Sequence, residues 1–144
     1  MRLPGVPGRL LVVVARARVA IASLRTGITL GPNVAGPGLG IAHHGSVVVN
    51  AHARIGSFVR IHSATNIGTD GTGAPVIGSR VYIGPGAVIY GPVHVGDGAV
   101  IGANAVVNKD VPPGVTVAGA PAKVISQRGS DAIMPRWWPR DHEH

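Results

Sequence analysis

The sequence predicts an all-β fold, a parallel β-helix of stacked three-sided coils with a short amino-terminal helix and an extended carboxy-terminal tail. The first observation is a ladder of Ile or Val at every sixth residue, with one ten-residue step after Ile67. A period of six is neither the 3.6 of a helix nor the 2 of a strand, so it indicates an internal repeat. The ladder positions are Val49, Ile55, Ile61, Ile67, Ile77, Ile83, Ile89, Val95, Ile101 and Val107.

The second observation is the composition. Twenty-two glycines and twelve prolines supply many turns, while one Phe, two Tyr and two Trp leave a core of small and β-branched side chains. The absence of Cys excludes a disulfide framework, a thiol nucleophile and a thiolate metal site. The net charge of +7 comes mostly from arginines near the two ends, which indicates solvated termini or attraction of a phosphorylated ligand. Basic residues do not alternate with aromatics inside the repeat, so nucleic acid is not an expected partner.

Three segments follow along the chain: residues 1–26, a β-helix domain over 27–125 and a tail over 126–144. Pro4 and Pro7 argue against a helix at the start, and a short amphipathic helix packed on the repeat is expected from Arg9 to Leu24. Its apolar run is too short for a signal or a membrane span, so we expect a cytoplasmic protein. Contact of its arginines with a membrane surface is the alternative. The tail, with Trp137 and Trp138, is expected to be loose or folded onto a neighbouring subunit.

Within the repeat, three hexads close one coil of 18 residues, and successive coils stack as parallel strands. Ala87 and Ala105 are 18 residues apart and should lie one above the other, as should His44 and His62. Six residues before Val49 stands His43, a polar side chain where the ladder requires an aliphatic one, and such a break indicates function. The ten-residue step inserts four residues between Gly68 and Val76, which predicts a protruding loop, and loops on a rigid scaffold often determine specificity.

Several of these stretches together resemble the hexapeptide-repeat acyltransferases, especially the serine acetyltransferase branch and its relatives that acetylate capsule or other sugars. The resemblance extends from about Gly27 to Ile125. It implies a left-handed β-helix, assembled as a homotrimer with acetyl-CoA in the groove between subunits and without a metal. It rests on the repeat itself, His43–Val49 (HHGSVVV), Ile83–Ile89 (IGPGAVI), Val111-Pro112-Pro113 and Ala118–Ile125 (AGAPAKVI).

The resemblance also implies specific roles for individual residues. His43 takes the place of the general base that accepts the proton of the acceptor hydroxyl during direct attack on acetyl-CoA. Gly68, Ala87, Ala105 and Gly119 would line the acetyl-CoA groove, with Lys123 and Lys109 facing the nucleotide phosphates. Candidates for the acceptor pocket are His44, His62 and Asp70.

The chain departs from the serine acetyltransferase pattern on the acceptor side. Ala42 stands where that branch has Asp before the His, the region Gly27–Leu30 offers only Thr29 where it has an orienting Asp, and Gly73-Ala74 replaces its Arg-His pair before Pro75. The resemblance and these departures together leave an L-serine-like molecule, a sugar or another alcohol as the expected acceptor.

Two other readings stay open at the level of the sequence. A non-catalytic β-helix module for binding or assembly would also keep the repeat without the acidic partners of His43. A zinc enzyme like the β-helical carbonic anhydrases would need three ligands, with His43, His52 or His94 joining His44 and His62.

Overall fold

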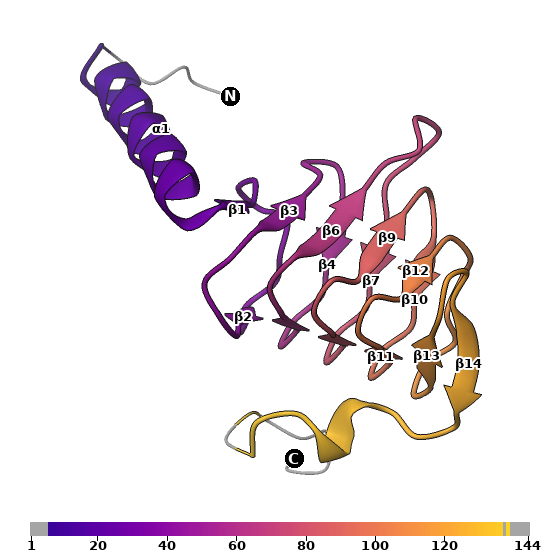
Figure 1. The fold of residues 1–144 in the computed structure, drawn as a ribbon. Coiled ribbons are helices and arrows are strands. Elements are labelled where there is room, and N and C mark those ends of the chain that lie inside the picture. Colours follow the sequence, from indigo (N-terminus) through magenta and orange to yellow (C-terminus); the bar gives the residue numbers. More distant parts are fainter. Residues whose placement is uncertain (1–5, 137, 139–144) are drawn as a thin grey trace.

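The computed structural model describes residues 6–136 and residue 138, and consists of one helix followed by a stack of short strands (Figure 1). The elements in chain order are α1 (Val6–Thr26), β1 (Ile28–Thr29), β2 (Gly40–Ile41), β3 (Val47–Val49), β4 (Arg54–Ile55), β5 (Arg60–Ile61), β6 (Thr65–Gly68), β7 (Val76–Ile77), β8 (Tyr82–Ile83), β9 (Val88–Tyr90), β10 (His94–Val95), β11 (Val100–Ile101), β12 (Val106–Val107), β13 (Thr116–Ala118), β14 (Lys123–Ser126) and the 3₁₀ helix η1 (Ser130–Ala132).

The strands form the three faces of a prism. Face A contains β1, β3, β6, β9 and β12; face B contains β4, β7 and β10; face C contains β2, β5, β8, β11 and β13, with β14 pairing antiparallel at its end. The other strand pairings in the described part of the chain are parallel. Val88 of β9, for example, lies opposite Val106 of β12 in the next coil. The predicted parallel β-helix is therefore confirmed.

The core fills the inside of the prism with columns of aliphatic side chains. On face C the column Ile61, Ile83 and Ile101 has no exposed surface. Side chains alternate along a strand, so Arg60 and Tyr82 point outward from the same strands. All ten ladder positions predicted from the six-residue period are buried.

Three edges join the faces, and each is named here by the faces that it connects. Edge CA comprises residues 42–46, 62–64, 84–87 and 102–105; edge AB comprises 50–53, 69–75, 91–93 and 108–110; edge BC comprises 36–39, 56–59, 78–81, 96–99 and 112–115. Tight turns at the edges require left-handed backbone, as at Ala64 and Asn104 on edge CA (φ 60° and 55°). Polar and charged side chains therefore lie on the edges and on the outer sides of the faces.

The first coil differs from the predicted register. Ile41 pairs with Ile61, so Ile41 holds the inward position that the ladder assigned to His43. The turn on edge CA then takes five residues, 42–46, where the next coil takes three, 62–64. The prediction that His43 replaces an inward aliphatic is wrong, because the longer turn carries it outside, where it is exposed.

The amino-terminal helix is longer and less attached than expected. It starts at Val6 and contains Pro7 in its first turn, where a missing N–H is tolerated. Five consecutive apolar residues, Leu10–Val14, cover its whole circumference at 100° per residue, so it is not amphipathic. It projects away from the coils, and Leu10, Leu11 and Leu24 are 66%, 71% and 87% exposed (Figure 1). In the described part of the chain, no helix combines the length and the apolar character needed to cross a membrane.

The tail, expected to be loose or on a neighbour, folds back onto its own coils (Figure 1). We call residues 127–136 with Trp138 the return segment; Trp137 lies outside the described residues. Ser130 donates its N–H to the Gly98 carbonyl at 2.8 Å and its Oγ–H to the Arg80 carbonyl at 2.5 Å, and Asp131 pairs with Arg80. Trp138 is only 7% exposed. The return segment thus runs along edge BC from the last coils toward the first.

Candidate functional site

A row of rings lies where face C meets edge CA and crosses three successive coils. The rings of His43 and His62 have centroids 5.6 Å apart, and those of His62 and Tyr82 are 5.0 Å apart. The structure therefore brings His43 and His62 together. The predicted stacking of His44 on His62 is wrong, because the first coil is two residues longer and Ala42, whose N–H binds the Ile61 carbonyl, lies beside His62 instead.

His62 lies in a partly buried, positively charged environment that changes its protonation. Burial lowers the pKa of His62, and the nearby charges of Arg60 and His43 lower it further. Its Nε2 is buried and has no hydrogen-bond partner among the described residues. Buried polar atoms are normally paired, so an orphaned ring nitrogen beside His43 is available to a bound hydroxyl or water.

The candidate acetyl-CoA residues Ala87 and Ala105 lie on the same edge as the histidines. They stack in adjacent coils as predicted, because Val88 pairs with Val106. Both alanine side chains are fully buried, so only their backbone can face a ligand. Gly119 continues the column, with its carbonyl accepting a hydrogen bond from the N–H of Val106 at 2.9 Å. The stacked backbone at these positions suits contact with an extended ligand arm.

Three other candidates lie away from this column. Asp70 and Lys109 are exposed on edge AB, at the opposite side of face A from His43. The Asp70 carboxylate accepts hydrogen bonds from the N–H and Oγ–H of Thr72, and these hydrogen bonds lower its pKa. Gly68 ends β6 beside the same loop. Within one chain, edge CA and edge AB form separate groups, so one groove could combine them only between subunits.

The remaining two candidates stand at the ends of edge CA. His44 is exposed in the long first turn, and together with His43, Ala42 and Thr26 it lines a small cavity of about 190 Å³. Lys123 begins β14 and is exposed near the last coil. Among the described residues, no three His, Asp or Glu side chains are grouped in a way that could hold a metal ion.

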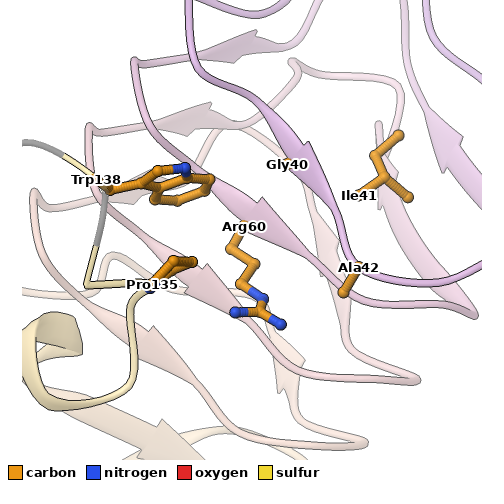
Figure 2. A pocket seen from close by; sticks show the side chains of 6 residues that line it. All are labelled: Gly40, Ile41, Ala42, Arg60, Pro135 and Trp138. Atoms are coloured by element: carbon orange, nitrogen blue, oxygen red, sulfur yellow. The ribbon is translucent and has the colours of Figure 1, made fainter.

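Sequence reasoning missed Arg60 and Trp138. Both line a cavity of about 360 Å³ next to Ala42, together with Gly40, Ile41 and Pro135 (Figure 2). The alternation in β5 could have indicated that Arg60 points outward on the side of His62. The return segment brings Trp138 from the other end of the chain, and no local pattern predicts that contact.

Comparisons with known proteins agree with the fold. Residues 74–109 match the family described as bacterial transferase hexapeptide (six repeats). The chain is 41% identical over 121 residues to the serine acetyltransferase of Helicobacter pylori strain J99, covering 79% of this chain and 70% of that protein. It is 38% identical over 131 residues to the serine acetyltransferase of Mycobacterium tuberculosis, covering 88% and 57%.

The solved structure of serine acetyltransferase in complex with coenzyme A from Brucella abortus superposes with a TM-score of 0.61 at 36% identity, covering 72% of this chain and 41% of that one. The chain therefore spans between two fifths and seven tenths of the length of these proteins. The likeness confirms the left-handed parallel β-helix.

Proposed function

Because this chain belongs to the serine acetyltransferase family of hexapeptide-repeat transferases, we propose that it transfers the acetyl group of acetyl-CoA to a hydroxyl of a small acceptor. The observation that carries the proposal is the arrangement of edge CA. His43 and His62 meet at its first coils, and the stacked backbone of Ala87 and Ala105 continues it toward Gly119. One edge thus offers a base at one end and a stacked backbone for contact with an extended ligand along the rest.

His43 is the proposed general base. It is exposed on the long turn and can reach a bound acceptor without a rearrangement of the coil. Its imidazole accepts the proton of the acceptor hydroxyl while that oxygen attacks the carbonyl carbon of the acetyl group. The imidazolium then returns the proton to the departing sulfur. Acetyl-CoA, when bound, supplies the acetyl group as a reactive thioester, and the chain has no Cys that could form an acyl-enzyme thioester.

His62 is proposed to assist from the next coil. Because burial and neighbouring charges lower its pKa, it stays neutral at pH 7 and avoids repelling a protonated His43. Its unpartnered Nε2 can form a hydrogen bond to the acceptor. The chain thereby has a polar partner in the region where the family pattern has acidic residues.

The working unit is proposed to be a homotrimer. Edge CA holds the bases, whereas Lys109, Asp70 and the inserted loop lie on edge AB. A groove between edge CA of one subunit and edge AB of the next would unite them, with Lys109 and Lys123 near the nucleotide phosphates. Sedimentation at micromolar concentration should give three times the mass of 14.6 kDa.

Activity is tested by release of the CoA thiol from acetyl-CoA in the presence of L-serine, neutral sugars, acidic sugars and hexosamines. The absence of Cys in the protein removes the background of a thiol reagent. His43→Ala should lower kcat/KM by about 10²- to 10⁴-fold, the usual contribution of a general base. The matched control is His94→Ala, an exposed histidine of β10 on face B, which should keep the wild-type rate.

Equal rates for wild type and His43→Ala would remove His43 from the mechanism. Calorimetric titration with CoA separates the remaining alternative. If no acceptor is acetylated and CoA does not bind, the chain is a non-catalytic β-helix module.

A further inference from the structure

The cavity beside Ala42 adjoins the proposed catalytic residues. It has a volume of about 360 Å³, at the lower end of the range for small-molecule sites. Figure 2 shows the Arg60 side chain extending between Pro135 and Ala42, with the indole of Trp138 above Pro135. Ile41 and Ala42 also line the cavity of His43 and His44, so the two hollows share a wall.

The indole wall of this cavity is held by specific packing. A Cβ added to Gly40 would lie 2.8 Å from Cζ2 of Trp138, so a glycine at this position lets the ring approach the strand this closely. The rings of Phe58 and Trp138 have centroids 6.2 Å apart. The hydrogen bonds of Ser130 hold the preceding part of the return segment on edge BC. An indole face fixed in this way offers a flat apolar surface to a ligand.

The opposite wall is positively charged. Arg60 projects outward from β5, and its charge is close enough to lower the pKa of His62, the residue that follows β5. The acids in the described part of the chain lie on edge AB (Asp70, Asp110), on edge BC (Asp97) or in the return segment (Asp131, which pairs with Arg80). No described carboxylate is therefore paired with Arg60.

We infer that this cavity is the acceptor subsite and that the acceptor is an acidic hydroxyl compound of monosaccharide size, such as a sugar acid or sugar phosphate. Arg60 binds its carboxylate or phosphate, since a guanidinium fork matches the oxygens of both groups. The apolar face of its ring lies against Trp138. The ammonium group of an amino-sugar acceptor would be repelled by Arg60, and no described carboxylate near the cavity could pair with that ammonium group. The inference rests on the proposed acetyl transfer and specifies its substrate class.

The test uses acceptors that differ mainly in charge: glucuronate, glucose 6-phosphate, glucose and glucosamine, with acetyl-CoA as donor. We expect kcat/KM for the better of the two acidic sugars to exceed that for glucose by about 10- to 100-fold, the size of one charge-assisted hydrogen bond. Comparison of the rates for glucuronate and glucose 6-phosphate shows whether the site prefers a carboxylate or a phosphate. Acetylation of glucose or glucosamine at a rate equal to or above both acidic sugars would overturn the inference.

Arg60→Gln should abolish the preference by lowering the rate for the acidic sugar to that for glucose. Arg54→Gln is the matched control, because Arg54 occupies the same outward position at the start of β4 on face B. It should preserve the preference. An Arg60→Gln protein that still prefers the acidic sugar would also overturn the inference.

A binding measurement keeps this inference separate from the proposed activity. Calorimetric titration of wild type and Arg60→Gln with glucuronate, glucose 6-phosphate and glucose needs no acetyl transfer. Arg60-dependent binding of an acidic sugar without any turnover would support the subsite and refute the proposed function. Turnover that is indifferent to acceptor charge would support the function and refute the subsite.

Discussion

The first coil and the later coils are built from the same repeat but differ at edge CA. In the third and fourth coils the turn takes four residues, 84–87 and 102–105, and presents small residues, as at Pro85-Gly86 and Ala103-Asn104. In the first coil it takes five residues and presents His43 and His44. The interior is aliphatic in both places, because Ile41 occupies the same column as Ile61 and Ile83.

This difference shows how a repeat acquires a chemical site without losing its core. Two extra residues in a turn move polar side chains outward while the strands on both sides keep their pairing. The regular coils provide a rigid wall, and the irregular coil adds His43 and His44 beside it. The two regions should therefore respond differently to mutation, and three predictions follow in order of decreasing expected effect.

Truncation of a core side chain should lower the free energy of unfolding most in the regular coils. Ile83→Ala removes a side chain with no exposed surface, so we expect the free energy of unfolding to fall by about 2–5 kcal/mol. Ile41→Ala in the same column should cost less than half as much, because Ile41 is only half-buried at the open end of the stack. Urea unfolding followed by circular dichroism measures both. Equal losses would show that the first coil is as tightly packed as the others.

Displacing the indole from the first coil should have the next largest effect. Gly40→Ala places a methyl group against Trp138, and overpacking of this kind costs about 1–3 kcal/mol. The same substitution in a Trp138→Ala background is the control, because the added methyl group then meets no ring. A double-mutant cycle from unfolding experiments gives the coupling energy between the two positions. Additive effects would place the indole elsewhere in solution.

The pH dependence contributed by His62 should be the smallest effect. Because its pKa is lowered in the folded protein, the unfolded chain binds a proton more readily between the lowered pKa and about 6.5. The free energy of unfolding should therefore fall as the pH drops through this window. The groups that face His62 are Arg60, His43 and Tyr82. His62→Asn should flatten the profile relative to wild type, and an unchanged slope would assign the titration to another group.

The sequence was sufficient for the fold, because the ladder reflects a physical requirement: each coil must place aliphatic side chains above those of the coil before. The same period failed at the first coil. Ile41 and Val47 to Val49 are all aliphatic, so the sequence allows both a six-residue and an eight-residue step back from Val49. Only the strand pairing of Ile41 with Ile61 decides between them.

The candidate site was predictable only in part. His43 stood out as a polar residue among aliphatics, and the stacking of Ala87 on Ala105 followed from one coil of 18 residues. Arg60 looked like an ordinary outward residue of a short strand, and its importance depends on Trp138, which is 78 positions later in the chain. A contact between such distant residues leaves no trace in a local period.

The return segment also changes how the β-helix should unfold. In a linear array each coil contacts only its neighbours, so the terminal coils can open while the middle stays folded. Here the return segment leaves the last coil, contacts Gly98 and Arg80, and places Trp138 against Gly40. This one segment therefore contacts nearly the whole stack of coils. Opening of the first coil must also release Trp138. The return segment thus links the first and last coils, so that local unfolding of one end becomes coupled to local unfolding of the other.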